Sequence, residues 1–219
     1  MKSKEKKIIL AGAMLLVAFV IWTVLVCAVD VREIGPGGSR VGFATLNEAV
    51  FKLTGVNFTL YEITDYLGLV PMLIALAYAT IGFIQLIKRK SIKRVDAGVL
   101  LLGALYITVF AVFALFEILK LNYRPVLING VLEASYPSST TMLVISTVPA
   151  VWAELSIRVK SRTLKAVIST LCPLFTVFMI LGRLLSGVHW VTDIIGGALF
   201  STGIAIIYIG ALRLINIQK

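Results

Sequence analysis

The chain has 219 residues, of which 59% are apolar and 15% are charged, and its formal net charge is +10. Soluble proteins carry about 25% charged residues, so this composition excludes an ordinary soluble domain and predicts an integral membrane protein. The positive charge requires no nucleic-acid partner, because membrane topology and anionic lipid account for basic residues beside apolar segments.

Six segments are long and apolar enough to cross a bilayer, whose hydrocarbon core requires about 20 residues of helix. The predicted spans are residues 8–29, 66–87, 97–119, 138–157, 166–186 and 190–215. A lysine-rich start precedes the first span, but its apolar run is too long for a secretory signal, so we interpret it as a retained helix. The sequence therefore predicts one all-α membrane domain over residues 1–219.

Lysine and arginine residues are concentrated at the chain ends and in every second loop between the predicted spans. Fifteen of them lie near the two chain ends and in the loops after the second and fourth spans, against six elsewhere. The positive-inside rule therefore predicts that both termini are cytoplasmic and that the opposite ends of the spans are extracytoplasmic. The short loops favour a bacterial cytoplasmic membrane.

A segment of about 36 residues separates the first two spans and is too long for a bare connection. Thr45-Leu-Asn-Glu48 matches a capping box, and apolar residues follow it at helical spacing. This pattern predicts a short amphipathic helix on the outer interface, which either walls a lipid entry path or simply packs as part of the loop. A second capping box, Thr59-Leu-Tyr-Glu62, predicts the start of the second span.

Two polar clusters lie at the outer ends of the third and fourth spans. The first runs from Lys120 to Arg124-Pro125, and the second is Tyr136-Pro137 followed by four hydroxyl residues. Pro137 suits the first turn of a helix, and the free N–H groups at such a helix start bind anions readily. Taken alone, the hydroxyl run is also typical of an ordinary N-cap. An Arg-Pro pair after a span is also typical of a helix end whose arginine extends toward the membrane interface.

The stretch from Arg183 to Asp193 contains the only histidine of the chain, His189. If a helix starts near Trp190, His189 and Asp193 share a face, and the carboxylate holds one imidazole nitrogen protonated. The other nitrogen is then free to attack, and the planar fork of Arg183 suits phosphate oxygens. Taken alone, such a histidine is also typical of a hydrogen-bonded interfacial residue.

These motifs resemble those of the type-2 phosphatidic acid phosphatase, or lipid phosphate phosphatase, superfamily, which shares its helical core with the vanadium haloperoxidases. The family pattern is a lysine, six residues and Arg-Pro; then Pro-Ser-Gly-His; then Ser-Arg, five residues, His, three residues and Asp. Arg124-Pro125 matches the end of the first motif, Pro137-Ser138 the start of the second, and Arg183, His189 and Asp193 the third. The resemblance covers roughly residues 60–215 and implies a six-span fold with its site on the outer face.

Four positions depart from the family pattern: Glu117 replaces the lysine, Gly182 a serine, Ser139 a glycine and Thr140 the second histidine. By resemblance, that histidine would be the general acid that protonates the leaving oxygen. Lys120 lies three residues beyond Glu117, so on a continuous helix it could restore the missing cation. No residue obviously restores the missing acid.

The missing acid bears on the substrate. A lipid alkoxide is a poor leaving group, because its conjugate acid is on the scale of water, with a pKa of about 15.7. A phosphate monoester that leaves from a diphosphate has a second pKa of roughly 6 and can depart unprotonated. Loss of a general acid worth about 10²–10⁴-fold therefore favours a diphosphate such as a polyprenyl diphosphate.

The sequence thus predicts a membrane-embedded phosphatase or phosphotransferase for lipid phosphates or diphosphates, acting through a phosphohistidine with no metal or cofactor. The predicted catalytic residues are His189, Asp193 and Arg183, and the predicted substrate-binding residues are Arg124, Lys120, Ser138, Ser139 and Thr140. The predicted partners are the lipid substrate and the bilayer. The alternative is a degenerate protein of the same fold that binds lipid phosphate without turnover, in regulation or transport, which Thr140 and Glu117 favour.

Overall fold

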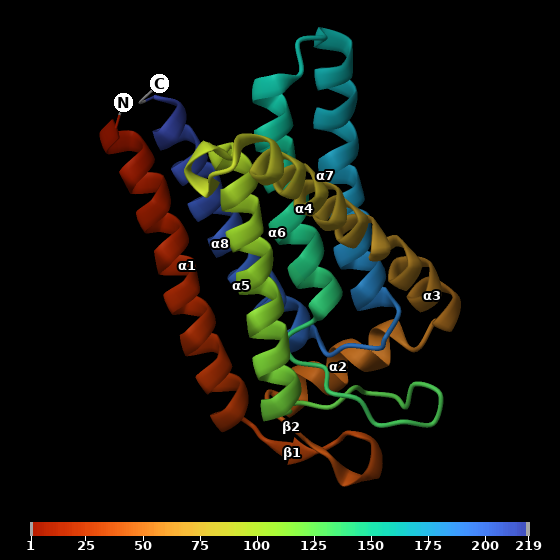
Figure 1. The fold of residues 1–219 in the computed structure, drawn as a ribbon. Helices are drawn as coiled ribbons and strands as arrows, with labels where there is room; N and C mark the ends of the chain where they lie inside the picture. Colours follow the sequence, from red (N-terminus) through yellow and green to blue (C-terminus); the bar gives the residue numbers. More distant parts are fainter. Residues whose placement is uncertain (1, 218–219) are drawn as a thin grey trace.

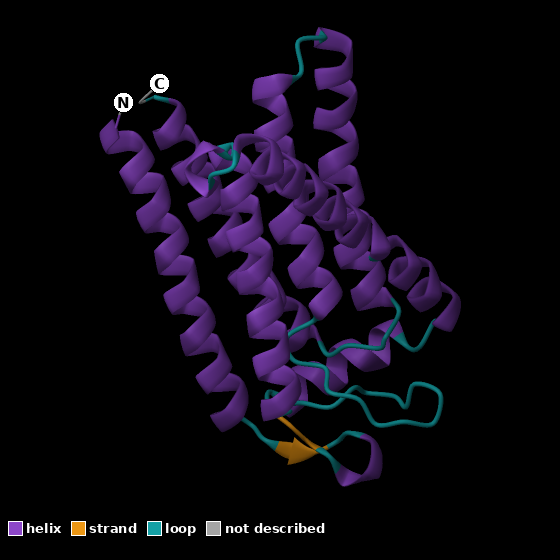
Figure 2. Cartoon of the chain, viewed as in Figure 1, coloured by secondary structure: helices purple, strands orange, loops and turns teal. Residues whose placement is uncertain are grey.

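Helices account for nearly all the regular structure in the computed structural model, which describes residues 2–217 (Figures 1 and 2). The α-helices are α1 (Lys2–Ala28), α2 (Ala44–Thr54), α3 (Phe58–Leu67), α4 (Leu69–Arg89), α5 (Ala97–Leu119), α6 (Ser139–Arg158), α7 (Arg162–Leu185) and α8 (Val191–Asn216). Strands β1 (Arg32–Glu33) and β2 (Arg40–Val41) pair antiparallel, and short 3₁₀ helices cover Pro36–Gly38 and Ile92–Arg94.

Six helical units are long and apolar enough to cross a membrane, which confirms the predicted number of spans. The second unit joins α3 and α4 around Gly68 and covers 32 residues, Phe58–Arg89, so it begins eight residues before the predicted span. Large apolar side chains point outward along these helices; Ile107, for example, is 72% exposed. Such a surface requires lipid around it, and the chain is an integral membrane protein.

Helix α8 lies at the centre of the bundle, with α1 and α6 packed along it. Phe19 of α1, Phe116 of α5, Phe200 of α8 and the loop residue Tyr136 form an aromatic cluster, with ring centroids 5.4–6.5 Å apart. Gly196 of α8 permits this arrangement, because a Cβ atom there would overlap the Tyr136 ring. Since Tyr136 comes just before α6, the cluster fixes the position at which α6 begins.

The two ends of the bundle differ in what they carry (Figure 1). Both termini lie at the same end as the α4–α5 and α6–α7 connections. The β-hairpin, α2, the long loop 120–138 and the α7–α8 turn lie at the opposite end. The basic stretches therefore share one end of the molecule, as their alternation predicts.

The predicted amphipathic helix is present as α2, but both predicted capping boxes are wrong. Helix α2 begins after Phe43, which makes no side-chain cap, and the Thr45 N–H donates instead to Asp30 Oδ2 at 2.6 Å. Helix α3 is capped by Asn57, whose side chain accepts from the Leu60 N–H at 2.9 Å. In both cases an oxygen outside the predicted box satisfies the free N–H groups of the helix start.

Candidate active site

His189 lies in the short turn between α7 and α8, and its side chain is 2% exposed. Gly187 makes the turn possible, because its φ of +67° suits glycine and a Cβ atom there would overlap the Gly55 carbonyl oxygen. The Ser186 carbonyl oxygen accepts from the Asn57 N–H at 3.0 Å, which ties the turn to the start of α3. The histidine is thus held in a turn that packs against the connection between α2 and α3.

The neighbours of His189 define which ring nitrogen carries the proton. Arg124 Nη1 lies 3.2 Å from Nε2, and a guanidinium donates hydrogen bonds but accepts none. Nε2 therefore presents its lone pair, and the proton is on Nδ1. Asp193 Oδ2 lies 3.6 Å from Nδ1, which is too far for the hydrogen bond that the sequence predicts between the two groups. Burial lowers the pKa of His189 well below its usual 6.5, and the charges of Arg124 and Arg183 lower it further. The imidazole is neutral, with Nε2 free to act as a nucleophile.

Asp193 is completely buried in the first turn of α8 and is held from two sides. Its Oδ2 accepts from the Trp190 N–H at 3.0 Å, and Asn122 Nδ2 donates to its Oδ1 at 3.3 Å. Trp190 is the N-cap of α8, so the expected helix start near this residue is confirmed. Asn122 was not predicted, since a single asparagine in a loop has no recognisable pattern.

Arg124 approaches His189 from the loop between α5 and α6. Its Nε lies 2.9 Å from Glu133 Oε2, and its Nη1 also donates to the Val188 carbonyl oxygen at 3.4 Å. The structure therefore brings together three predicted site residues, Arg124, His189 and Asp193.

Arg183 lies in the last turn of α7, with its side chain 1% exposed and facing α3. Its Nη1 lies 3.4 Å from both Asp65 Oδ1 and Thr64 Oγ1. The Tyr61 ring centroid lies 5.0 Å from the Arg183 guanidinium and 5.9 Å from that of Arg124. One aromatic ring thus lies beside both cations and helps to hold them as neighbours.

The start of α6 combines a cap with free backbone donors. Ser138 is buried as the N-cap and accepts from the Thr141 hydroxyl at 3.0 Å and the Thr141 N–H at 3.5 Å. Pro137 therefore precedes the cap, and its predicted place in the first turn is wrong. The N–H groups of Ser139 and Thr140 precede the first intrahelical donor, so they remain available to an anion.

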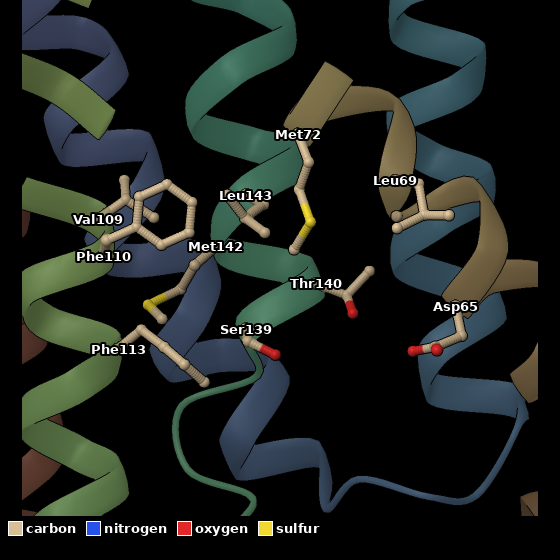
Figure 3. A pocket seen from close by; sticks show the side chains of 11 residues that line it. Asp65, Leu69, Met72, Val109, Phe110, Phe113, Ser139, Thr140, Met142 and Leu143 are labelled. Carbon is tan, nitrogen blue, oxygen red and sulfur yellow. The ribbon is translucent and has the colours of Figure 1, made fainter. Parts of the chain in front are cut away.

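Two cavities meet at Ser139 and Phe113, which line both of them. The smaller, of about 20 Å³, is lined by His189, Arg124 and Glu117 among others and has room for about one water molecule. The larger, of about 170 Å³, lies among α3, α4, α5 and α6. Figure 3 shows Asp65 reaching from α3 toward Ser139 and Thr140, with apolar side chains above them. A polar chamber and a mostly apolar one are therefore contiguous.

The apolar lining continues beyond the larger cavity. Phe110 also lines an open groove of about 800 Å³ between α4 and α5, where nearly all the other lining residues are apolar. This groove faces the surface that the bilayer covers. Phe110 therefore lies where the groove and the larger cavity approach each other.

Lys120 and Glu117 differ from the expectation that they share a helix face. Lys120 lies after the last residue of α5 with a left-handed φ of +48°, and its side chain is exposed. Glu117 lines the small cavity and Lys120 does not. A role for Lys120 in binding phosphate remains a prediction.

Comparison with known proteins agrees with this geometry. The model of the PAP2 superfamily matches residues 107–215, which include Arg124, Arg183, His189 and Asp193. The fold is similar to the crystal structure of the first transmembrane PAP2-type phosphatidylglycerolphosphate phosphatase from Bacillus subtilis, with a TM-score of 0.64 and 18% sequence identity. The similarity covers 92% of this chain and 96% of that chain. Among curated proteins, no sequence matches.

Proposed function

Because the chain belongs to the PAP2 superfamily, we propose that it is a membrane-embedded phosphatase or phosphotransferase for lipid phosphates or diphosphates. One observation carries this proposal most directly. Nε2 of His189 lies 3.2 Å from the Arg124 guanidinium, in a cavity contiguous with an apolar chamber. A nucleophile, an anion partner and a place for a lipid tail are therefore adjacent.

In the proposed first step, Nε2 of His189 attacks the phosphorus atom and forms a phosphohistidine. The small cavity holds about one water molecule, so Arg124 must turn from Nε2 toward a phosphate oxygen when the substrate enters. Arg183 and the N–H groups of Ser139 and Thr140 bind the other oxygens as charge develops. Asp193 stabilises the imidazolium that forms, because it lies beside Nδ1.

The lipid part of the substrate occupies the larger cavity and the groove between α4 and α5. Met72, Phe110 and Phe113 line this path, and only its inner end is polar. A single-chain lipid such as a polyprenyl chain suits a narrow apolar route, and burial of each CH₂ contributes about 0.8 kcal/mol. Thr140 supplies no acid at the position of the family histidine, and a diphosphate, whose leaving phosphate needs no proton, depends least on such an acid.

We further propose that the site faces the extracytoplasmic side of a bacterial cytoplasmic membrane. Fifteen of the 21 basic residues lie near the termini and in the two loops that share their end of the bundle. The positive-inside rule then makes that end cytoplasmic.

A second candidate is a protein that binds lipid phosphate without turnover. Thr140 and Glu117 favour this candidate. Thr140 leaves the site without the expected acid, and Glu117 places a carboxylate beside the anion pocket. The geometry around His189 favours catalysis, since binding alone needs no oriented imidazole.

Phosphate release by the purified protein distinguishes the two candidates. The panel contains lipid monophosphates and diphosphates, and the variants are His189→Ala and Asp193→Asn. The enzyme hypothesis predicts turnover that His189→Ala abolishes nearly completely and Asp193→Asn reduces by orders of magnitude, as loss of a tautomer-fixing aspartate does elsewhere. Binding of lipid phosphate without release would instead support the second candidate.

A further inference from the structure

The direction of attack at phosphorus indicates which cavity holds the nucleophile and which receives the leaving group. Phosphoryl transfer proceeds with the attacking and leaving atoms roughly in line. His189 lines the small cavity, so the leaving oxygen points away from it, toward the 170 Å³ cavity beyond Ser139. The lipid is attached to that oxygen, and this second cavity is the one with an apolar lining. This assignment rests on the proposed function.

Asp65 is, within the part of the chain that the structure describes, the one ionisable residue that lines the leaving-group cavity. Its carboxylate extends from α3 toward Ser139 and Thr140 (Figure 3). Those two residues offer hydroxyl groups, which are about as weakly acidic as the departing alcohol and give no driving force for proton transfer. Glu117 lines the small cavity with His189, on the side of the nucleophile.

The contacts of Asp65 leave its carboxyl group free to act. The side chain is 57% exposed, and its closest ion-pair contact is Arg183 Nη1 at 3.4 Å, longer than the 2.7–2.9 Å typical of a charge-assisted hydrogen bond. A phosphate that enters between them competes for the same guanidinium. The released carboxyl group then lies beside the phosphate, in the cavity that receives the leaving oxygen.

We propose that Asp65 is the general acid and base of the reaction, in the place of the histidine that is absent at position 140. As the bond from Nε2 to phosphorus forms, the bond from phosphorus to the lipid oxygen breaks, and that oxygen takes the Asp65 proton. The Asp65 carboxylate then accepts a proton from the water that attacks the phosphohistidine. This second step breaks the bond from phosphorus to Nε2, releases phosphate and restores the neutral imidazole and carboxyl group.

The test is Asp65→Asn on a matched pair of substrates, a polyprenyl monophosphate and the corresponding diphosphate. Only the monophosphate expels an alkoxide and needs the proton, so its kcat/KM should fall by about 10²–10⁴-fold, and that of the diphosphate far less. Asp65→Glu keeps an acid and should retain most monophosphate hydrolysis. Thr140→His in the Asp65→Asn background should restore it, because it returns an acid to the same cavity.

Glu62→Gln is the matched control, because Glu62 is an exposed carboxylate on α3 that lines neither cavity. This substitution should change kcat/KM for neither substrate. An equal loss of kcat/KM on both substrates in Asp65→Asn, or a loss selective for the monophosphate in Glu117→Gln in its place, would overturn the role of Asp65 while leaving the phosphatase itself intact. If the unaltered protein released phosphate from neither substrate, both the proposed function and the role of Asp65 would be contradicted.

Discussion

The protonation state of His189 determines the chemistry of the site at the scale of single residues. Because burial and two neighbouring guanidiniums lower its pKa, we expect the imidazole to stay neutral, with its proton on Nδ1, as the pH falls through 6.5. His189 is the only histidine of the chain, so ¹⁵N-labelled histidine gives a single imidazole spectrum in detergent micelles. A titration midpoint at or above pH 6.5, or a proton on Nε2, would contradict this assignment.

The lowered pKa of His189 also predicts how acid affects the stability of the folded protein. In the unfolded chain His189 binds a proton near pH 6.5, whereas in the folded protein it does so only at lower pH. The unfolded state therefore binds more protons in this window, and stability falls as the pH drops below 6.5. This contribution is absent in His189→Gln, so the midpoint of thermal unfolding of the variant should change less between pH 7 and pH 5.5 than that of the unaltered protein.

Sequence reasoning found some residues of the site and missed others for identifiable reasons. Arg124, His189 and Asp193 belong to spaced motifs at helix ends, so their convergence was predictable. Tyr61 and Asp65 lie on α3, which meets α7 only in three dimensions and carries none of those motifs. Their spacing of four residues does place them on one helix face, and this was the available signal.

At the scale of helices, the start of α6 should couple stability to activity. Ser138→Ala removes an N-cap, and we expect a loss of about 1 kcal/mol in the free energy of unfolding. It should also lower kcat/KM, because the N–H groups of Ser139 and Thr140 lose their fixed position. Chemical unfolding and phosphate release measure the two effects.

Ser161→Ala is the matched control for this prediction. Ser161 caps α7 in the same manner, with its Oγ accepting from the Leu164 N–H at 3.3 Å, but at the end of the bundle away from His189. It should lower stability by a similar amount and leave kcat/KM unchanged. Equal loss of activity in both variants would show that the start of α6 has no special role in the site.

Helix starts were the least predictable elements, because distant groups compete with local ones for the same N–H donors. The Thr45 N–H binds Asp30 from the preceding loop, and Asn57 caps α3 two residues before the predicted Thr59. Helix α2 itself was predictable from its amphipathic pattern. Its contact with α8 was not: Asn47 of α2 is buried, and its Nδ2 donates to Thr192 Oγ1 at 3.0 Å.

At the scale of the whole molecule, the six spans were predictable because the length and hydrophobicity of a transmembrane helix are set by the bilayer. The tilted continuation of α3 into α4 was not, since the polar residues of α3 lowered its apolar signal (Figure 1). Packing of α3 against α7 brings those polar residues to the site.

Orientation in the membrane is testable with single cysteines at positions 37 and 160, in a background without Cys27 and Cys172. Gly37 lies in the hairpin loop and Lys160 in the α6–α7 loop, at opposite ends of the bundle (Figure 1). The positive-inside rule predicts that an impermeant thiol reagent labels only position 37 in intact cells. Labelling of position 160 alone would place the His189 site on the cytoplasmic side.

The central claim is that Nε2 of His189 attacks phosphorus, and trapping of the intermediate tests it most directly. The purified protein is mixed with a lipid diphosphate carrying ³²P in its terminal phosphoryl group, and the reaction is stopped in base, where phosphohistidine survives. The account predicts label on the single peptide that contains His189, absent in His189→Ala and lost on brief treatment with acid. Turnover that releases labelled phosphate in His189→Ala, or label on any other residue, would contradict it.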